Sequence, residues 1–144
     1  MQRGNEWWDS WFLGMAKYAA TASKDPSTQT GAVIVRSDKT VASLGFNGFP
    51  KGMTDHEKYY ADRDIKLSRI VHCEMNAILH CKEDMNGYTL YTWPFLSCDR
   101  CAVHVIQSGI KRVVAPKNNV ERWQEAFVRS RVFFSEAGVA VKEL

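Results

Sequence analysis

The pattern of hydrophobic and polar positions changes from a helical period to short apolar runs along the first third of the chain. Between residues 6 and 22, apolar side chains recur every three or four positions, which predicts an amphipathic helix. The helix is expected to end before Asp25-Pro26, because proline disfavours helical geometry in the residue before it. Two runs rich in β-branched residues follow, 32–35 and 41–46, and the polar turn between them predicts a β-hairpin.

The second half of the chain alternates between helical and extended patterns. Helices are expected at 74–79, 99–108 and 120–137, and strands at 88–92, 110–115 and 139–141. This alternation predicts an α/β fold, a three-layer α/β/α sandwich with a mixed five-stranded sheet whose later strands run side by side under covering helices. Without repeats or linkers, 144 residues predict a single domain over residues 1–144.

Two segments between the hairpin and the next helix are not ordinary connectors. Residues 45–52 contain three glycines and a proline, which indicates that backbone geometry matters in this loop. The charged segment 54–68 is too long for a simple connection. It is interpreted as a lid, an inserted helix or an effector contact.

Composition narrows the classes of function. Hydrophobic residues make up 45% of the chain and charged residues 24%, as in ordinary globular proteins. A net charge of +3 without any run of five Lys/Arg predicts no nucleic-acid partner and suits a small anionic ligand. The chain has neither an apolar stretch of about 18 residues nor a signal-peptide pattern, so we expect no membrane contact and a cytoplasmic setting.

Cysteine and histidine residues supply the candidate chemistry. Cys98 and Cys101 lie about one helical turn apart at a predicted helix start, where free N–H groups favour thiolates. His72 and Glu74 can reach one point only if His72 lies at or before the first turn of its helix. Three ligands, His72, Cys98 and Cys101, leave the fourth position of Zn²⁺ open for water, and Glu74 is the catalytic proton carrier.

The main alternative is a zinc-stapled interaction domain with a closed metal site. His104 lies three residues after Cys101 and is a candidate fourth ligand, as are Cys73 and Cys81. That arrangement leaves Glu74 without a role. Otherwise Cys73 and Cys81 are expected to be small buried side chains. His56 could bind a second metal ion, but a polar side chain in contact with solvent is the favoured interpretation.

The pattern His-x-Glu followed by Pro-Cys-x-x-Cys is the zinc deaminase signature, although Ser97 stands here where the signature has proline. Over segments 23–32, 45–50, 72–77 and 98–102, the chain resembles the deoxycytidylate (dCMP) deaminases of the cytidine deaminase superfamily. The resemblance implies a cytidine deaminase-like fold and hydrolysis of dCMP to dUMP and ammonia, which feeds thymidylate synthesis. Deamination of dCTP is the alternative, and tRNA adenosine deamination is disfavoured by the modest charge.

The same resemblance assigns roles to residues outside the metal motif. It implies that Asn47 hydrogen-bonds the sugar or base, and that Ser23, Lys24 and Thr28 help to receive the 5′-phosphate. The alternatives are a plain turn at 25–28 and a left-handed backbone at Asn47. The binding role is favoured for Asn47, whereas for Lys24 the two explanations are about equal.

Regulation and assembly are also implied by the resemblance. In family members the glycine-rich loop binds triphosphate effectors, dCTP as activator and dTTP as inhibitor, so Gly45, Asn47, Gly48 and Phe49 are effector candidates and Mg²⁺ would accompany the triphosphate. Relatives form ring-shaped homo-oligomers, commonly hexamers. The helix faces with Trp7, Trp8, Trp11 and Phe12 are candidates for such contacts, or for the core.

Overall fold

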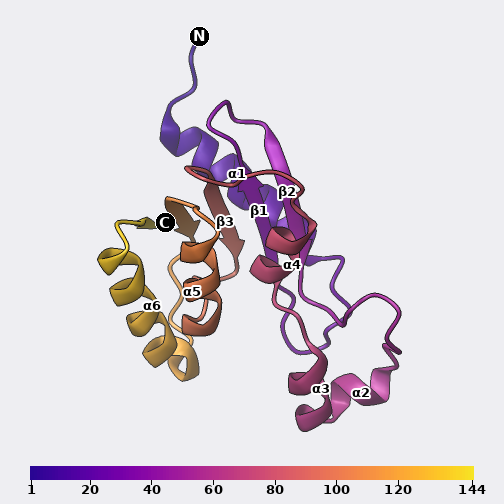
Figure 1. Ribbon diagram of the computed structural model, residues 1–144. Helices are drawn as coiled ribbons and strands as arrows, with labels where there is room; N and C mark the ends of the chain where they lie inside the picture. Colours follow the sequence, from indigo (N-terminus) through magenta and orange to yellow (C-terminus); the bar gives the residue numbers. More distant parts are fainter.

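The structure is a computed structural model that describes residues 1–144. A five-stranded sheet forms its centre (Figure 1). In spatial order the strands are β2, β1, β3, β4 and β5. β1 is antiparallel to both of its neighbours, whereas β3, β4 and β5 run parallel. The mixed sheet predicted from the sequence is therefore confirmed. The strand bounds are Gly31–Val35 for β1, Val41–Phe46 for β2, Thr89–Trp93 for β3, Arg112–Ala115 for β4 and Ala140–Glu143 for β5.

Helices cover both faces of the sheet, and the three-layer α/β/α arrangement is confirmed (Figure 1). Helix α1 packs on one face, while α4, α5 and α6 lie on the other. The helix bounds are Asn5–Ala20 for α1, Glu57–Ala61 for α2, Arg63–Arg69 for α3, Cys73–His80 for α4, Asp99–Gln107 for α5 and Gln124–Glu136 for α6, with a 3₁₀ turn η1 at Glu121–Trp123. None of these helices has the length and apolar character needed to span a bilayer.

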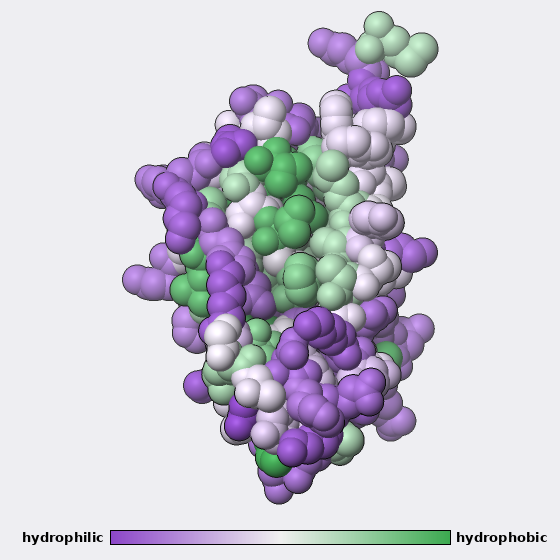
Figure 2. Space-filling view, turned by 90° about the vertical axis from the view of Figure 1, so that its right-hand side faces the viewer, coloured by the Kyte–Doolittle hydropathy of each residue, from purple (hydrophilic) through white to green (hydrophobic).

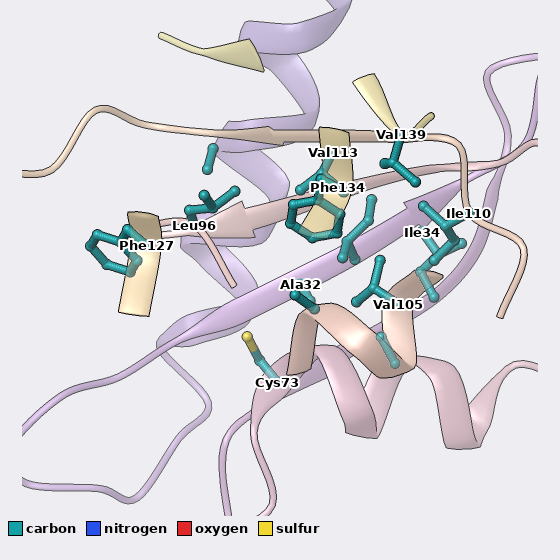
Figure 3. Close-up of a cluster of buried hydrophobic side chains, with 14 residues drawn as sticks. Ala32, Ile34, Cys73, Leu96, Val105, Ile110, Val113, Phe127, Phe134 and Val139 are labelled. Atoms are coloured by element: carbon teal, nitrogen blue, oxygen red, sulfur yellow. The ribbon is translucent and has the colours of Figure 1, made fainter. Parts of the chain in front are cut away.

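Alternation along β1 divides the core between the two faces. Ala32 and Ile34 belong to the larger hydrophobic cluster, which lies between the sheet and α4, α5 and α6 (Figure 3). Val33 and Val35 belong to the smaller cluster beneath α1. Successive strand side chains point to opposite faces, so a strand buried on both sides reads as a continuous apolar run.

The charged segment 54–68 forms two short helices, α2 and α3, so the inserted-helix interpretation is confirmed. The side chain of Asp62 caps α3 by accepting a hydrogen bond from the backbone of Ile65. The Phe49 ring stacks on the Tyr60 ring with 4.2 Å between centroids, which ties α2 to the glycine-rich loop. The helix expected at 120–137 is divided into η1 and α6.

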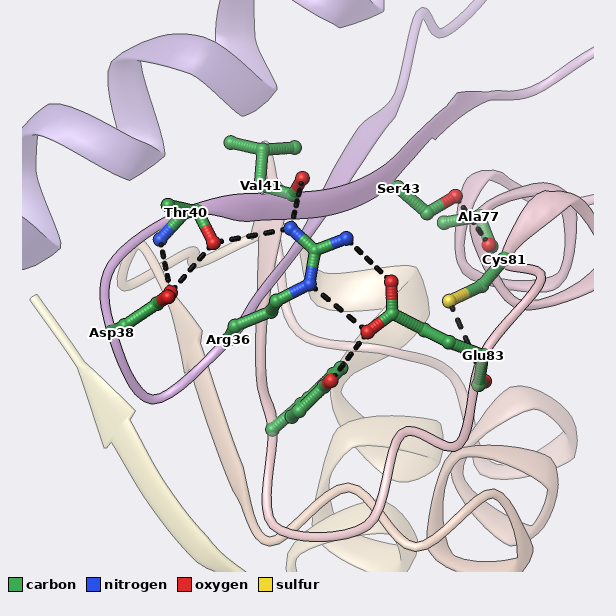
Figure 4. Close-up of polar contacts among 9 residues, drawn as sticks. Arg36, Asp38, Thr40, Val41, Ser43, Ala77, Cys81 and Glu83 are labelled. Carbon is green, nitrogen blue, oxygen red and sulfur yellow. Dashed lines mark hydrogen bonds and ion pairs between the residues drawn. The ribbon is translucent and has the colours of Figure 1, made fainter.

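A polar network joins the hairpin to the loop after α4 (Figure 4). The Arg36 guanidinium donates two hydrogen bonds to the Glu83 carboxylate and one to the backbone carbonyl of Val41. Tyr88 donates to the same carboxylate. Because the ion pair is partly exposed, it adds little to stability and mainly orients the loop.

Candidate active site

Two helix N-termini bring the predicted metal ligands together. His72 is the N-cap of α4, Cys98 is the N-cap of α5, and Cys101 lies in the first turn of α5. Nδ1 of His72 is 3.2 Å from Sγ of Cys101 and 3.6 Å from Sγ of Cys98. Neither N-cap side chain bonds to its own helix, so both are available to a shared ion. All three ligand atoms lie within 4.8 Å of one another.

The three side chains are close enough to shift one another's pKa values, and a bound cation would displace the protons that they share. The pKa of Cys98 falls to about 4 because the Cys101 thiol donates a hydrogen bond to its thiolate, with His72 contributing as well. The same thiolate raises the pKa of His72 to about 8 and raises the pKa of Cys101 far above its ordinary value. One imidazole nitrogen and two thiolate sulfurs are the ligand types of zinc. The residues present therefore fit a zinc ion.

No fourth side chain completes a closed site. The His104 ring lies 2.8 Å from a backbone carbonyl of its own helix, and Cys81 faces the carbonyl of Glu83 at 3.8 Å. Cys73 is turned toward Glu74. The closed four-ligand alternative therefore lacks its last ligand. His56 caps α2 by accepting a hydrogen bond from Lys58 at Nδ1.

A pocket of about 160 Å³ opens beside the ligand cluster. His72, Cys98 and the buried Glu74, which is only 5% exposed, line it at one end. Its walls combine apolar side chains with a few polar and cationic groups, an arrangement typical of small-molecule sites. The apolar wall includes Trp93, Phe95, Leu96, Trp123 and Phe127, the polar part includes Asp25, Ser27, Thr28, Thr30 and Asn47, and the cations are Arg63, Lys66 and Arg122.

The predicted substrate residues divide into two groups. Asn47 and Thr28 line the pocket, whereas Ser23 and Lys24 do not. The Ser23 hydroxyl donates to the backbone carbonyl of Asn47 at 2.9 Å and so holds the backbone of the glycine-rich loop in place. Lys24 forms an exposed ion pair with Asp55 outside the pocket. The cations that line the pocket come instead from α3 and η1.

Asp25 organises the polar wall, a role that the sequence did not predict. Its carboxylate is 5% exposed and accepts hydrogen bonds from the backbone of Ser27 at 2.8 Å and from Lys66 Nζ at 2.9 Å. Nδ2 of Asn47 lies 3.3 Å from the same carboxylate. Asp25-Pro26 was recognisable as a turn, but the contact with Lys66, 41 residues away, was not.

Asn47 is itself held by the loop that it faces. Its Nδ2 donates to the carbonyl of Thr28 at 2.9 Å, and its Oδ1 accepts from the backbone of Thr30 at 2.8 Å. These bonds fix the orientation of the amide. Oδ1 accepts this one hydrogen bond and has the capacity to accept a second.

The other candidate effector residues contact the protein itself. A Cβ atom on Gly45 would lie 2.5 Å from Cys73 O and from Ala77 N, so glycine allows β2 to approach α4. Gly48 forms an isolated antiparallel bridge with Val71, the residue before His72. Gly45, Gly48 and Phe49 lie outside the lining of the pocket. Through the bridge between Gly48 and Val71, the loop helps to position His72.

A second serine anchors the segment where the deaminase signature has proline. The Ser130 hydroxyl, on α6, donates to the carbonyl of Ser97 at 2.7 Å, directly before Cys98. The Ser97 hydroxyl is buried without a hydrogen-bond partner. Contact with α6 thus constrains the approach to Cys98, and only the tertiary structure reveals it.

Residues 6–117 match the family profile described as the cytidine and deoxycytidylate deaminase zinc-binding region. The chain belongs to this deaminase family. Its zinc-binding region includes His72, Cys98 and Cys101, the side chains whose ligand atoms converge. The membership inferred from the motifs is therefore confirmed.

Individual members of the deaminase family match nearly the whole chain. The uncharacterized deaminase in the luxG 3′ region of Aliivibrio fischeri is 41% identical over 137 residues, covering 93% of this chain and 91% of the relative. The Homo sapiens deoxycytidylate deaminase is 34% identical over 142 residues, covering 94% of this chain and 79% of the relative. The crystal structure of the cyanophage S-TIM5 dCMP deaminase with dCMP and dUMP shares the fold, with a TM-score of 0.77 at 20% identity over 99% of this chain and 100% of that one.

Proposed function

We propose that this enzyme hydrolyses dCMP to dUMP and ammonia. The observation that carries the proposal is the convergence of His72, Cys98 and Cys101 on one point at the end of a pocket that also contains Glu74. Relatives that are named deoxycytidylate deaminases and span 94% of the chain support dCMP as the substrate. The product would feed thymidylate synthesis.

In this proposal the zinc ligands and Glu74 divide the chemistry. His72, Cys98 and Cys101 would hold the ion, which would lower the pKa of the water molecule that attacks C4. Glu74 takes a proton from the attacking water and delivers it to ring N3 of cytosine. Glu74 next takes the remaining proton from the hydroxyl group added at C4 and transfers it to the amino group, so that the C4–N bond breaks, the C4–O bond becomes a carbonyl and ammonia leaves.

The pocket walls account for binding of the base and sugar in the same proposal. Trp93, Phe95 and Trp123 line the pocket and offer apolar surface to a flat base while limiting the access of water. Asn47 and Thr28 form part of the polar wall. The free lone pair on Asn47 Oδ1 accepts a hydrogen bond from a sugar hydroxyl.

We assign the 5′-phosphate to the cations that line the pocket. Arg63 and Lys66 lie three residues apart on α3 and therefore share a face of the helix. Lys66 is paired with Asp25, whereas Arg63 forms no ion pair. Arg63→Gln is expected to raise the KM for dCMP about tenfold, because a charge-assisted contact with phosphate is lost. Deoxycytidine, which lacks the phosphate, should be unaffected.

Lys24→Gln is the matched control for the phosphate assignment. Lys24 lies outside the pocket and pairs with Asp55, so its replacement should leave the KM for dCMP within about twofold of wild type. If Lys24→Gln raises the KM for dCMP and Arg63→Gln does not, the phosphate binds near Lys24, as the resemblance to dCMP deaminases implied.

Ammonia release from dCMP, dCTP and deoxycytidine tests the proposed activity. We expect turnover of dCMP to exceed that of the other two, whereas faster turnover of dCTP would replace dCMP as the substrate. Glu74→Gln should keep its zinc and lose at least about a thousandfold in kcat, since no other group can carry the proton. Inactivity of the wild type on all three compounds would overturn the proposal.

Regulation and assembly belong to the same proposal. We expect dCTP and dTTP, each with Mg²⁺, to act at the glycine-rich loop, and the chain to form a homo-oligomer such as a hexamer. Trp7 and Trp11 are 38% and 44% exposed on α1, whereas Phe12 is fully buried and belongs to the core. Figure 2 shows apolar side chains gathered on the side of the edge strand β2, where Leu44 is 50% exposed.

Light scattering coupled to size exclusion tests assembly, with and without dCTP. An oligomer is expected because exposed apolar side chains of this extent favour association. A monomer at every protein concentration would contradict this expectation. Activity measured with added dCTP and dTTP tests regulation separately.

A further inference from the structure

The residue between His72 and Glu74 is a cysteine that does not join the metal ligands. Sγ of Cys73 lies 2.8 Å from Oε1 of Glu74 and donates a hydrogen bond to it. No other hydrogen bond reaches the Glu74 carboxylate. The one anchor of the proposed proton carrier is therefore its neighbour in the sequence.

The surroundings of Cys73 hold its thiol in place. The side chain is 2% exposed and packs in the core cluster with Ala32 and Ala77. Figure 3 shows its sulfur turned from the start of α4 toward the sheet. The backbone of Cys73 is also in close contact with Gly45 of β2. The Thr30 hydroxyl is the other polar side-chain group beside this sulfur, and the hydrogen bond that the thiol donates runs to Glu74.

We propose that Cys73 is a positioning residue for the deamination reaction. Its thiol holds Oε1 of Glu74, which leaves Oε2 directed at the attacking water and at ring N3 of the cytosine. This assignment rests on the proposed function, because it depends on Glu74 carrying the proton. The alternative role, expected from the sequence, is that of a small apolar side chain that only fills space.

Three variants of Cys73 separate the hydrogen bond from the packing. Cys73→Ala removes the donor, Cys73→Val restores volume without a donor, and Cys73→Ser restores a donor. We expect kcat for dCMP to fall about tenfold in the alanine and valine variants, because a hydrogen bond to a charged group is lost. The serine variant should keep kcat within about threefold of wild type. KM should change by less than about twofold in the alanine and serine variants, because Cys73 is one of many residues that line the pocket and neither replacement is much larger.

Cys81→Ala is the matched control, because Cys81 lies outside the pocket and its thiol faces a backbone carbonyl. We expect this variant to have the kcat of wild type. Bound zinc and the melting temperature, measured for every variant, identify any loss that comes from the metal site or from unfolding.

The outcomes distinguish this assignment from the proposed function. An active wild type with full kcat in Cys73→Ala overturns the positioning role alone. The same holds if Cys73→Ser is as slow as Cys73→Ala, since the requirement is then for shape. A wild type that is inactive on every cytosine nucleotide overturns the proposed function, and the role of Cys73 with it.

Discussion

Gly45 and Gly48 are three positions apart in one glycine-rich loop, yet they meet different requirements. An added Cβ would collide with the backbone of α4 at Gly45, whereas the space beside Gly48 is open. Neither glycine has a positive φ, so conformational freedom does not explain either residue. The close approach at Gly45 is set by packing between two elements, which a glycine count cannot reveal.

Alanine substitution distinguishes these two glycines. Gly45→Ala is expected to lower the free energy of unfolding by about 2 kcal/mol or more, because backbone atoms of α4 must move to admit the methyl group. Gly48→Ala should change the free energy of unfolding by less than about 0.5 kcal/mol. Urea unfolding followed by circular dichroism measures both. Equal stabilities would show that α4 tolerates displacement from β2.

At the scale of elements, one buried carboxylate connects α1 to three strands. Asp9, which is 1% exposed, accepts hydrogen bonds from Tyr91 of β3 at 2.8 Å and from Arg112 of β4 at 2.6 and 2.8 Å. Lys142 of β5 lies 3.4 Å from it. Burial by itself raises the pKa of Asp9, but the hydrogen bonds from Arg112 and Tyr91 outweigh it and lower the pKa to about 2.

The lowered pKa of Asp9 makes the attachment of α1 dependent on pH. Because the folded-state pKa lies below the unfolded value of 3.8, the carboxylate stabilises the fold above about pH 4, and this contribution is lost as the pH falls toward 2. Asp9→Asn is expected to cost about 2 kcal/mol at neutral pH, since Arg112 loses its partner. Denaturant unfolding between pH 7 and pH 3 should show the variant losing less stability on acidification than wild type.

Glu136→Gln is a suitable control for Asp9→Asn. Glu136 is exposed and forms no ion pair, so its neutralisation should change stability by less than about 0.5 kcal/mol. If Asp9→Asn and Glu136→Gln unfold alike at every pH, the network around Asp9 does not anchor α1.

At the scale of the whole molecule, a shared ion would cross-link the N-termini of α4 and α5 on one face of the sheet. A ligand that binds only the folded state stabilises it by about 4 kcal/mol when free zinc is a thousandfold above its dissociation constant. For a chain of this length that corresponds to about 10 °C in melting temperature. We expect a strong chelator to produce a shift of this order and to abolish turnover, and added zinc to restore both.

Variants of the site residues show whether the change in melting temperature comes from loss of zinc. Glu74→Gln keeps all three ligands and should keep the full response to chelator, whereas His72→Ala should lose most of it. If the chelator leaves the melting temperature of the wild type unchanged, the proposed metal site is wrong. One cooperative transition in the same scans is expected if residues 1–144 form a single domain.

The sequence by itself determined the mixed sheet, the ligand cluster and the order of the elements apart from α2, α3 and η1. Their signals are local: short apolar runs for the strands, the period of a helix, and two pairs of residues each confined to one helix start. Such patterns can be recognised in the sequence without knowledge of the fold. The departure at Ser97 was also visible, but its consequence was not.

Only the tertiary structure decided which residues surround the pocket and which side chains distant in the sequence form hydrogen bonds. Asp25 meets Lys66 of α3, Ser97 meets Ser130 of α6, and Asp9 meets Arg112, over separations of 41, 33 and 103 residues. The same geometry placed Lys24 outside the pocket and Arg63 on its wall. These contacts depend on how the elements pack against the sheet, and side chains brought together by packing leave no periodic trace in the chain.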